Sequence, residues 1–171
     1  DSVSLRYPLP AALCAERELQ RYGFHGIAHA ALLHAVATFA RTDPGRIDAV
    51  TLQLGSGCSA WAIAQGRSIE TSMGFSPLGG FPMSTRPGDL DPGVLLELLR
   101  DHTPAQLERL LTHESGLVGV AGLADMRELL RREASGEPSA GLALDLFVRR
   151  LVMCVGAYFT LLGGRGALVF G

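Results

Sequence analysis

His25 is the residue whose surroundings most suggest chemistry. It lies in the stretch RYGFHGIAH, residues 21–29, between Gly23 and Gly26, where a helix is predicted to begin. Glycines permit unusual backbone dihedrals and the close approach of a ligand, and an imidazole can donate, accept or carry charge near neutral pH. The pattern has two interpretations: a helix-entry turn whose imidazole is satisfied by its neighbours, or an imidazole that faces a ligand.

Arg86 is a second candidate. It lies in STRPGDLDP, residues 84–92, a loop rich in turn residues. A guanidinium on such a loop presents a planar fork of donors that suits a phosphoryl or carboxylate group. The simpler interpretation is a solvated surface charge, followed by Asp91 as the N-cap of the next helix.

A glycine-rich turn, LGSG at residues 54–57, joins two predicted strands. Successive backbone N–H groups without side chains in the way form a concavity that suits an anion. The strand–helix–strand context of a dinucleotide fingerprint is absent, so the pattern alone is a weak indication of phosphate binding.

Metal and thiol chemistry have less support. His25 and His29 are four residues apart and would share a helical face if the helix began early enough, which gives a metal-dependent hydrolase as a further hypothesis. The sequence supplies no nearby third ligand and no HExxH motif. The three cysteines, Cys14, Cys58 and Cys154, are far apart, so we expect small buried apolar residues rather than a disulfide framework.

The composition excludes several classes of function. The net charge of −2 argues against nucleic acid or an acidic membrane surface as a partner. The chain has no lysine, which excludes a phosphate-loop lysine, a Schiff base and a pyridoxal phosphate anchor. Its most apolar run, residues 151–164, is shorter than the roughly 20 residues that span a bilayer. No secretory signal is visible, so we expect a cytoplasmic protein.

Hydrophobic periodicity and turn residues predict the elements. Helices are expected over 11–21, 27–41, 91–101, 103–113, 123–134 and 138–162, and strands over 49–54, 59–64, 67–72 and 167–170. Three strands in a row predict an antiparallel meander, and the helices before the last strand predict an α/β domain with a mixed sheet. The missing initiator methionine and the final GALVFG lead us to expect a piece truncated at both ends.

Taken in order, these stretches resemble the acetate kinase family. RYGFHGIAH looks like the family's RYGFHGTSH. Residues 50–92 run alongside a family pattern that contains HLGNG, TSMGFTPLEG and GTRSGDIDP. SGLVGVAGLADMREL, residues 115–129, is similar to SGxxGxSGxSSDxRxL. The resemblance covers essentially the whole chain.

The resemblance implies an actin-like, sugar-kinase-like (ribonuclease H-like) ATPase fold. Residues 1–171 would form a single partial domain, most of the second domain of a two-domain protein. ATP would bind between the domains with Mg²⁺ on its phosphates. A short-chain carboxylate, acetate first, would give an acyl phosphate and ADP by in-line transfer. The metal ligands would lie outside this chain, the piece alone would be inactive, and the full-length protein would be a homodimer.

The resemblance also implies roles for individual residues. His25 would donate to the transferring phosphoryl group, and Arg86 would stabilise the same charge. The residues expected to bind nucleotide or phosphate are Gln53, Leu54, Gly55, Ser56 and Gly57 in the hairpin, with Asp125, Met126 and Arg127 near the sugar and base.

The chain departs from the family pattern at several of these positions. Gln53 stands where the family has histidine, and Ser56 where it has asparagine. Ile27 and Ala28 replace a threonine and a serine. Glutamine can still donate a hydrogen bond but cannot become a cation. The alternative hypothesis is therefore a degenerate nucleotide-binding or interaction protein that keeps the fold without catalysis.

Overall fold

A computed structural model describes residues 3–171. The chain forms two compact units, one that runs to Gly80 and takes in Met153–Gly171, and one made of Phe81–Val152. The expectation that residues 1–171 make up one partial domain of a longer protein stays a prediction.

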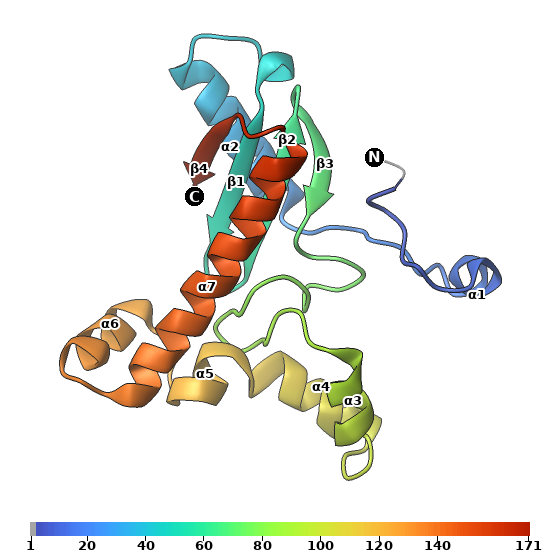
Figure 1. The fold of residues 1–171 in the computed structure, drawn as a ribbon, viewed down its shortest axis with the longest axis vertical. Helices are drawn as coiled ribbons and strands as arrows, with labels where there is room; N and C mark the ends of the chain where they lie inside the picture. Colours follow the sequence, from blue (N-terminus) through green and yellow to red (C-terminus); the bar gives the residue numbers. More distant parts are fainter. Residues whose placement is uncertain (1–2) are drawn as a thin grey trace. The chain divides into compact units, whose positions relative to one another are not determined.

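A four-stranded mixed sheet organises the first unit, in the order β3-β2-β1-β4 (Figure 1). β1 and β2 pair antiparallel, as do β2 and β3, whereas β4 runs parallel to β1. The predicted meander and mixed sheet are therefore confirmed. The strands are β1 (Ala49–Leu54), β2 (Cys58–Ala64), β3 (Arg67–Thr71) and β4 (Ala167–Phe170).

The register of β1 on β2 places four non-aliphatic side chains on one face of the sheet. Thr51 lies opposite Trp61, and Gln53 lies opposite Ser59. Directly opposed residues of an antiparallel pair point to the same face, as do residues two apart along one strand. Thr51 and Ser59 are fully buried, so something on this face must satisfy their hydroxyl groups.

Helix α2 (Gly26–Phe39) lies against β1 and β4 (Figure 1). It contributes Ala37 to a buried cluster with Ile47 and Ala49. The helix stops two residues before the predicted end, because Arg41 takes a φ of 52° and leaves the helical region. Helix α1 (Ala11–Glu16) is likewise shorter than predicted, and Glu18 has a φ of 52°.

Short capped helices make up most of the second unit. Asp91 accepts a hydrogen bond from the Gly93 N–H at 2.7 Å, which confirms it as an N-cap. Thr103 forms a capping box with Gln106 at the start of the next predicted helix. The helices are α3 (Pro92–Leu98), α4 (Pro104–His113), α5 (Gly116–Ala121), α6 (Met126–Ala134) and the start of α7 (Pro138–Leu161), which ends in the first unit. Helix α5 was not predicted, because its GLVGVA sequence resembles loop composition.

Two further features bear on the predictions. In residues 3–171, no helix is both long and apolar enough to cross a membrane. No cysteine among residues 3–171 forms a disulfide; Cys58 is buried, whereas Cys14 and Cys154 are only half-buried. The expectation of small buried cysteines is therefore right for Cys58 and wrong for the other two.

Candidate functional site

His25 occupies a left-handed backbone conformation at the N-cap of α2, with φ 61° and ψ 26°. The pattern predicted unusual dihedrals at the flanking glycines. Gly23 has a positive φ of 69°, but Gly26 is an ordinary first helical residue and the histidine itself carries the second positive φ. Positive φ is uncommon for a residue with a Cβ, and such strain persists only where the surroundings hold it.

Contacts with β2 hold the loop that carries His25. Its Nδ1 lies 2.8 Å from the Ser59 Oγ, and the Trp61 indole N–H donates to the Phe24 carbonyl at 3.2 Å. The imidazole is half-buried. Because Nδ1 is engaged by the sheet, Nε2 is the ring nitrogen left for a ligand.

His29 is a fully buried histidine whose two ring nitrogens are both engaged. Nδ1 lies 2.7 Å from the Thr51 Oγ1, and Nε2 lies 2.8 Å from the Ser59 Oγ. Its ring stacks on Trp61 with 4.8 Å between centroids. The protonated ring nitrogen has no lone pair for a metal, and the lone pair of the other is occupied by its hydrogen bond, which counts against the hydrolase hypothesis.

Burial and the neighbouring His25 charge lower the pKa of His29 to about 4, with burial the larger cause. An imidazolium at this position would need two buried acceptors and would lie beside a second ring that can also take a proton. His29 is therefore neutral near pH 7, with one proton shared between two possible nitrogens.

The predicted phosphate turn is a three-residue loop between β1 and β2. Gly55 and Ser56 are exposed and Gly57 is half-buried. The base of the loop is held from both sides. The Leu54 N–H donates to the Gly171 carbonyl at 2.9 Å, and the Cys58 thiol donates to the Gly55 carbonyl at 3.1 Å. Burial raises the pKa of Cys58 to about 11, so this thiol stays protonated.

Gln53 connects this loop to the histidine pair. It is half-buried and lies opposite Ser59 in the sheet register, on the face that carries the bonds to His25 and His29. Its Nε2 lies 3.8 Å from the position that a Cβ on Gly55 would occupy. The structure therefore brings the predicted hairpin residues and His25 to one end of one sheet face.

Arg86 belongs to the second unit and is half-buried rather than a fully solvated charge. Its carbonyl accepts from the Met83 N–H at 2.9 Å, and its Nη1 lies 3.9 Å from the Met83 Sδ. A Cβ on Gly116 would collide with the backbone of both Met83 and Arg86. The Arg86 loop is thus packed tightly against the start of α5.

Asp125, Met126 and Arg127 also lie in the second unit, at the start of α6. The Asp125 carboxylate accepts from the Glu128 N–H at 2.9 Å, which makes it the N-cap, and the helix begins three residues later than predicted. Met126 is half-buried and Arg127 is exposed. These contacts are those of a helix N-cap followed by a surface arginine.

The predicted residues therefore fall into two groups. His25 and residues 53–57 share one unit, whereas Arg86 and residues 125–127 belong to the other. Sequence reasoning missed Thr51 and Ser59 and considered His29 only as a candidate metal ligand. The available signal was the presence of polar residues at alternate positions of otherwise apolar strands, which predicts a buried polar network.

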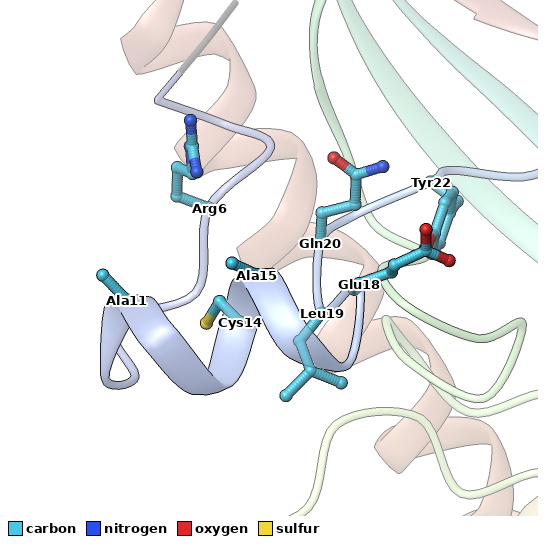
Figure 2. Close-up of a pocket in the computed structure, with 8 residues that line it drawn as sticks. All are labelled: Arg6, Ala11, Cys14, Ala15, Glu18, Leu19, Gln20 and Tyr22. Carbon is cyan, nitrogen blue, oxygen red and sulfur yellow. The ribbon is translucent and has the colours of Figure 1, made fainter.

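A separate pocket of about 390 Å³ lies beside α1. Figure 2 shows Arg6 on one side of it and Glu18, Gln20 and Tyr22 on the other. Its remaining lining residues are Ala11, Cys14, Ala15 and Leu19. No residue predicted from the motifs lines this pocket, so it is a different place from the candidate site.

Comparison with known proteins gives a consistent result. A family model described as the acetokinase family matches residues 2–171. An acetate kinase of Leifsonia xyli subsp. xyli is 46% identical over 172 residues, which cover 99% of this chain and 43% of that protein. An acetate kinase of Streptococcus mutans is 39% identical over 173 residues, 98% of this chain and 43% of the relative.

Solved structures agree. The crystal structure of Porphyromonas gingivalis acetate kinase matches with a TM-score of 0.94 at 33% identity, over 98% of this chain and 43% of that one. A propionate kinase from Francisella tularensis matches with a TM-score of 0.90 at 31% identity, over 94% and 42%. The predicted fold is confirmed, and the chain spans about two fifths of the length of the relatives it matches.

Proposed function

Because the chain belongs to the acetokinase family, we propose that the protein containing it transfers the γ-phosphoryl group of ATP to a short-chain carboxylate, with acetate as the first candidate. A carboxylate oxygen forms a bond to the γ-phosphorus while the bond from that phosphorus to the β–γ bridging oxygen breaks. The products are an acyl phosphate and ADP. Propionate is the second candidate, since one matched structure is named a propionate kinase.

The observation that carries this proposal is the way His25 is held. A strained backbone conformation and a bond from Nδ1 to buried Ser59 fix the imidazole beside an exposed glycine loop. Phosphoryl transfer needs positioned donors rather than covalent chemistry by the protein. In this role, Nε2 of His25 donates to an oxygen of the transferring phosphoryl group.

The hairpin supplies the second element of this role. The exposed backbone of Gly55 and Ser56 can approach ATP phosphates closely, and the Gln53 amide at the same end of the sheet adds a neutral donor. Arg86 is assigned to the same developing charge, because a half-buried guanidinium on a tightly packed loop keeps its donors oriented. Residues 125–127 are assigned to the nucleotide's sugar and base.

A role for Mg²⁺ on the ATP phosphates is proposed only because the family resemblance implies it. Among residues 3–171, no three His, Cys, Asp or Glu side chains come together where they could hold a metal ion. This part of the chain therefore offers no complete ligand set, and no step is assigned to the metal. We further propose that the full-length protein is a homodimer and that residues 1–171 alone turn over no ATP.

The test is turnover by the full-length protein with ATP and acetate, propionate or butyrate, with the acyl phosphate trapped by hydroxylamine. His25→Asn is the informative variant, since asparagine also tolerates positive φ but lacks the imidazole. We expect kcat to fall at least about tenfold, the cost of a lost charge-assisted bond. His34→Asn is the matched control, because His34 is exposed on the same helix. Absence of product from all three acids would contradict the proposal.

A second candidate function is a nucleotide-binding protein of this fold that transfers nothing. Gln53 and Ser56 favour it: Gln53 replaces a histidine with a group that cannot carry a positive charge, and Ser56 replaces the amide of an asparagine with a hydroxyl group. Calorimetry with ATP, taken together with the assay for acyl phosphate, separates the two functions. Binding of ATP by the full-length protein without acyl phosphate formation supports this second candidate.

A further inference from the structure

Ser59 is the only direct link that the described contacts give between the two histidines. Its Oγ lies 2.8 Å from Nδ1 of His25 and 2.8 Å from Nε2 of His29, and the residue is fully buried. A hydroxyl group has a single proton, so it can donate to one of these rings only. Whichever ring it donates to, the other must supply a proton of its own or leave a buried contact unmade.

The other end of the chain of contacts is Thr51, whose Oγ1 lies 2.7 Å from Nδ1 of His29. Burial keeps His29 neutral near pH 7, so only one of its ring nitrogens carries a proton. When the Ser59 hydroxyl donates to one of the two rings, these contacts have two arrangements, and each is fixed by the proton position on His29.

In the first arrangement, Thr51 donates to Nδ1 of His29, Nε2 of His29 donates to Ser59, and Ser59 donates to Nδ1 of His25. A neutral His25 that accepts at Nδ1 must carry its proton on Nε2. Its remaining nitrogen is then a hydrogen-bond donor, which is what a phosphoryl oxygen requires.

In the second arrangement every bond is reversed. Nδ1 of His25 donates to Ser59, Ser59 donates to Nε2 of His29, and Nδ1 of His29 donates to Thr51. A neutral His25 would then present only a lone pair at Nε2, which repels a phosphoryl oxygen. A cationic His25 satisfies this arrangement and still keeps an N–H at Nε2.

We propose that Ser59 and His29 are positioning residues for His25: they hold it by Nδ1, and in the resting protein they keep its Nε2 as the proton-bearing nitrogen that faces the phosphoryl group. The role of these hydrogen-bonded side chains in catalysis rests on the proposed function. The proton arrangement on the two histidines does not depend on it. His29 takes no part in the chemistry and acts through Ser59. Its stacking on Trp61 and its bond to Thr51 keep the ring from turning.

Kinetics on the full-length protein test the role of Ser59. Ser59→Ala removes one buried hydroxyl and leaves both ring contacts unmade. Ser72→Ala is the matched control: Ser72 is also buried, and its hydroxyl accepts from the Ala60 N–H at 2.9 Å without a contact to either histidine. We expect Ser59→Ala to lower kcat about 10- to 100-fold with KM for ATP changed less than about threefold, and Ser72→Ala to keep kcat within about twofold.

Nitrogen NMR of the full-length protein with ¹⁵N-labelled histidine tests the proton arrangement directly, at a pH where both rings are neutral. In the wild type we expect the His29 proton on Nε2 of His29 and the His25 proton on Nε2 of His25. In Ser59→Ala the acceptor for that proton is gone, so the proton moves to Nδ1 and is donated to Thr51. A merely structural serine would leave the His29 tautomer unchanged.

The outcomes separate this inference from the proposed function. A His29 proton found on Nδ1 in the wild type overturns the inference. This NMR measurement needs no variant, so it holds even if Ser59→Ala does not fold. Equal kcat losses in Ser59→Ala and Ser72→Ala overturn the positioning role. If the wild type makes no acyl phosphate, the proposed function fails, and the positioning role in transfer is overturned with it. The NMR result then still decides the proton arrangement.

Discussion

The stability of the first unit is expected to depend on pH through His29. The pKa of His29 is lowered to about 4 in the folded protein, whereas 6.5 is the ordinary value that the unfolded chain keeps. Between these values the unfolded chain binds a proton that the folded protein does not. Stability therefore rises with pH: the contribution of His29 is complete above about pH 6.5 and is lost as the pH falls toward 4.

The size of this effect follows from the two pKa values. Proton linkage gives a loss of about 2 kcal/mol in the free energy of unfolding between about pH 7.5 and pH 5. The full difference between the two pKa values sets an upper limit of about 3 kcal/mol. A loss of about 2 kcal/mol corresponds to roughly a 30-fold increase in the open population of the segment around His29.

Amide hydrogen exchange of residues 49–64 in the full-length protein measures how often this segment opens at each pH. The strands β1 and β2 carry both hydroxyl partners of His29. His29→Gln is the comparison, because glutamine stays polar and neutral at every pH in the window. After correction for the intrinsic exchange rate, we expect opening to increase about 30-fold in the wild type and less than about threefold in the variant. Equal pH dependence in the two proteins would refute this account of His29.

Two further predictions concern positions where the chain offers a direct comparison. Gln53→His adds a side chain that can become a cation near the exposed loop, and we expect any measurable kcat of the full-length protein to rise about 10- to 100-fold; an unchanged or lower kcat would remove the basis for calling the site impaired. Gly116→Ala and Gly122→Ala both place a Cβ at positive φ, at 64° and 73°, but only at Gly116 does the Cβ collide with backbone. Denaturant unfolding should show a loss of about 1 kcal/mol for Gly122→Ala and about 2–4 kcal/mol for Gly116→Ala, and equal losses would contradict the tight packing of the Arg86 loop.

The elements that sequence patterns predicted well are those with local signals. The Thr103 capping box needs only two residues three positions apart, and a glycine-containing turn joins the strands β1 and β2. Boundaries were wrong where a single residue changes conformation. Glu18 and Arg41 adopt a positive φ just after their helices, and neither glutamate nor arginine is a residue type that predicts this conformation.

The site was predictable in part for the same reason. His25 and the glycine hairpin are recognisable as motifs, so their residues could be named from sequence. The function of His29 could not be predicted from sequence, because it depends on Ser59 and Thr51, which lie 30 and 22 residues away on two strands. Only the strand register, which is a tertiary property, brings those hydroxyls to the two nitrogens of one ring.

Trp61 gives this site an optical reporter of its own. It is the only tryptophan in the 171 residues, its ring stacks on His29, and its indole N–H holds the Phe24 carbonyl of the His25 loop. An imidazolium against an indole quenches its fluorescence, whereas a neutral imidazole does so much less. Emission from this segment therefore records proton uptake at His29 and detachment of the loop, without any dye attached to the protein.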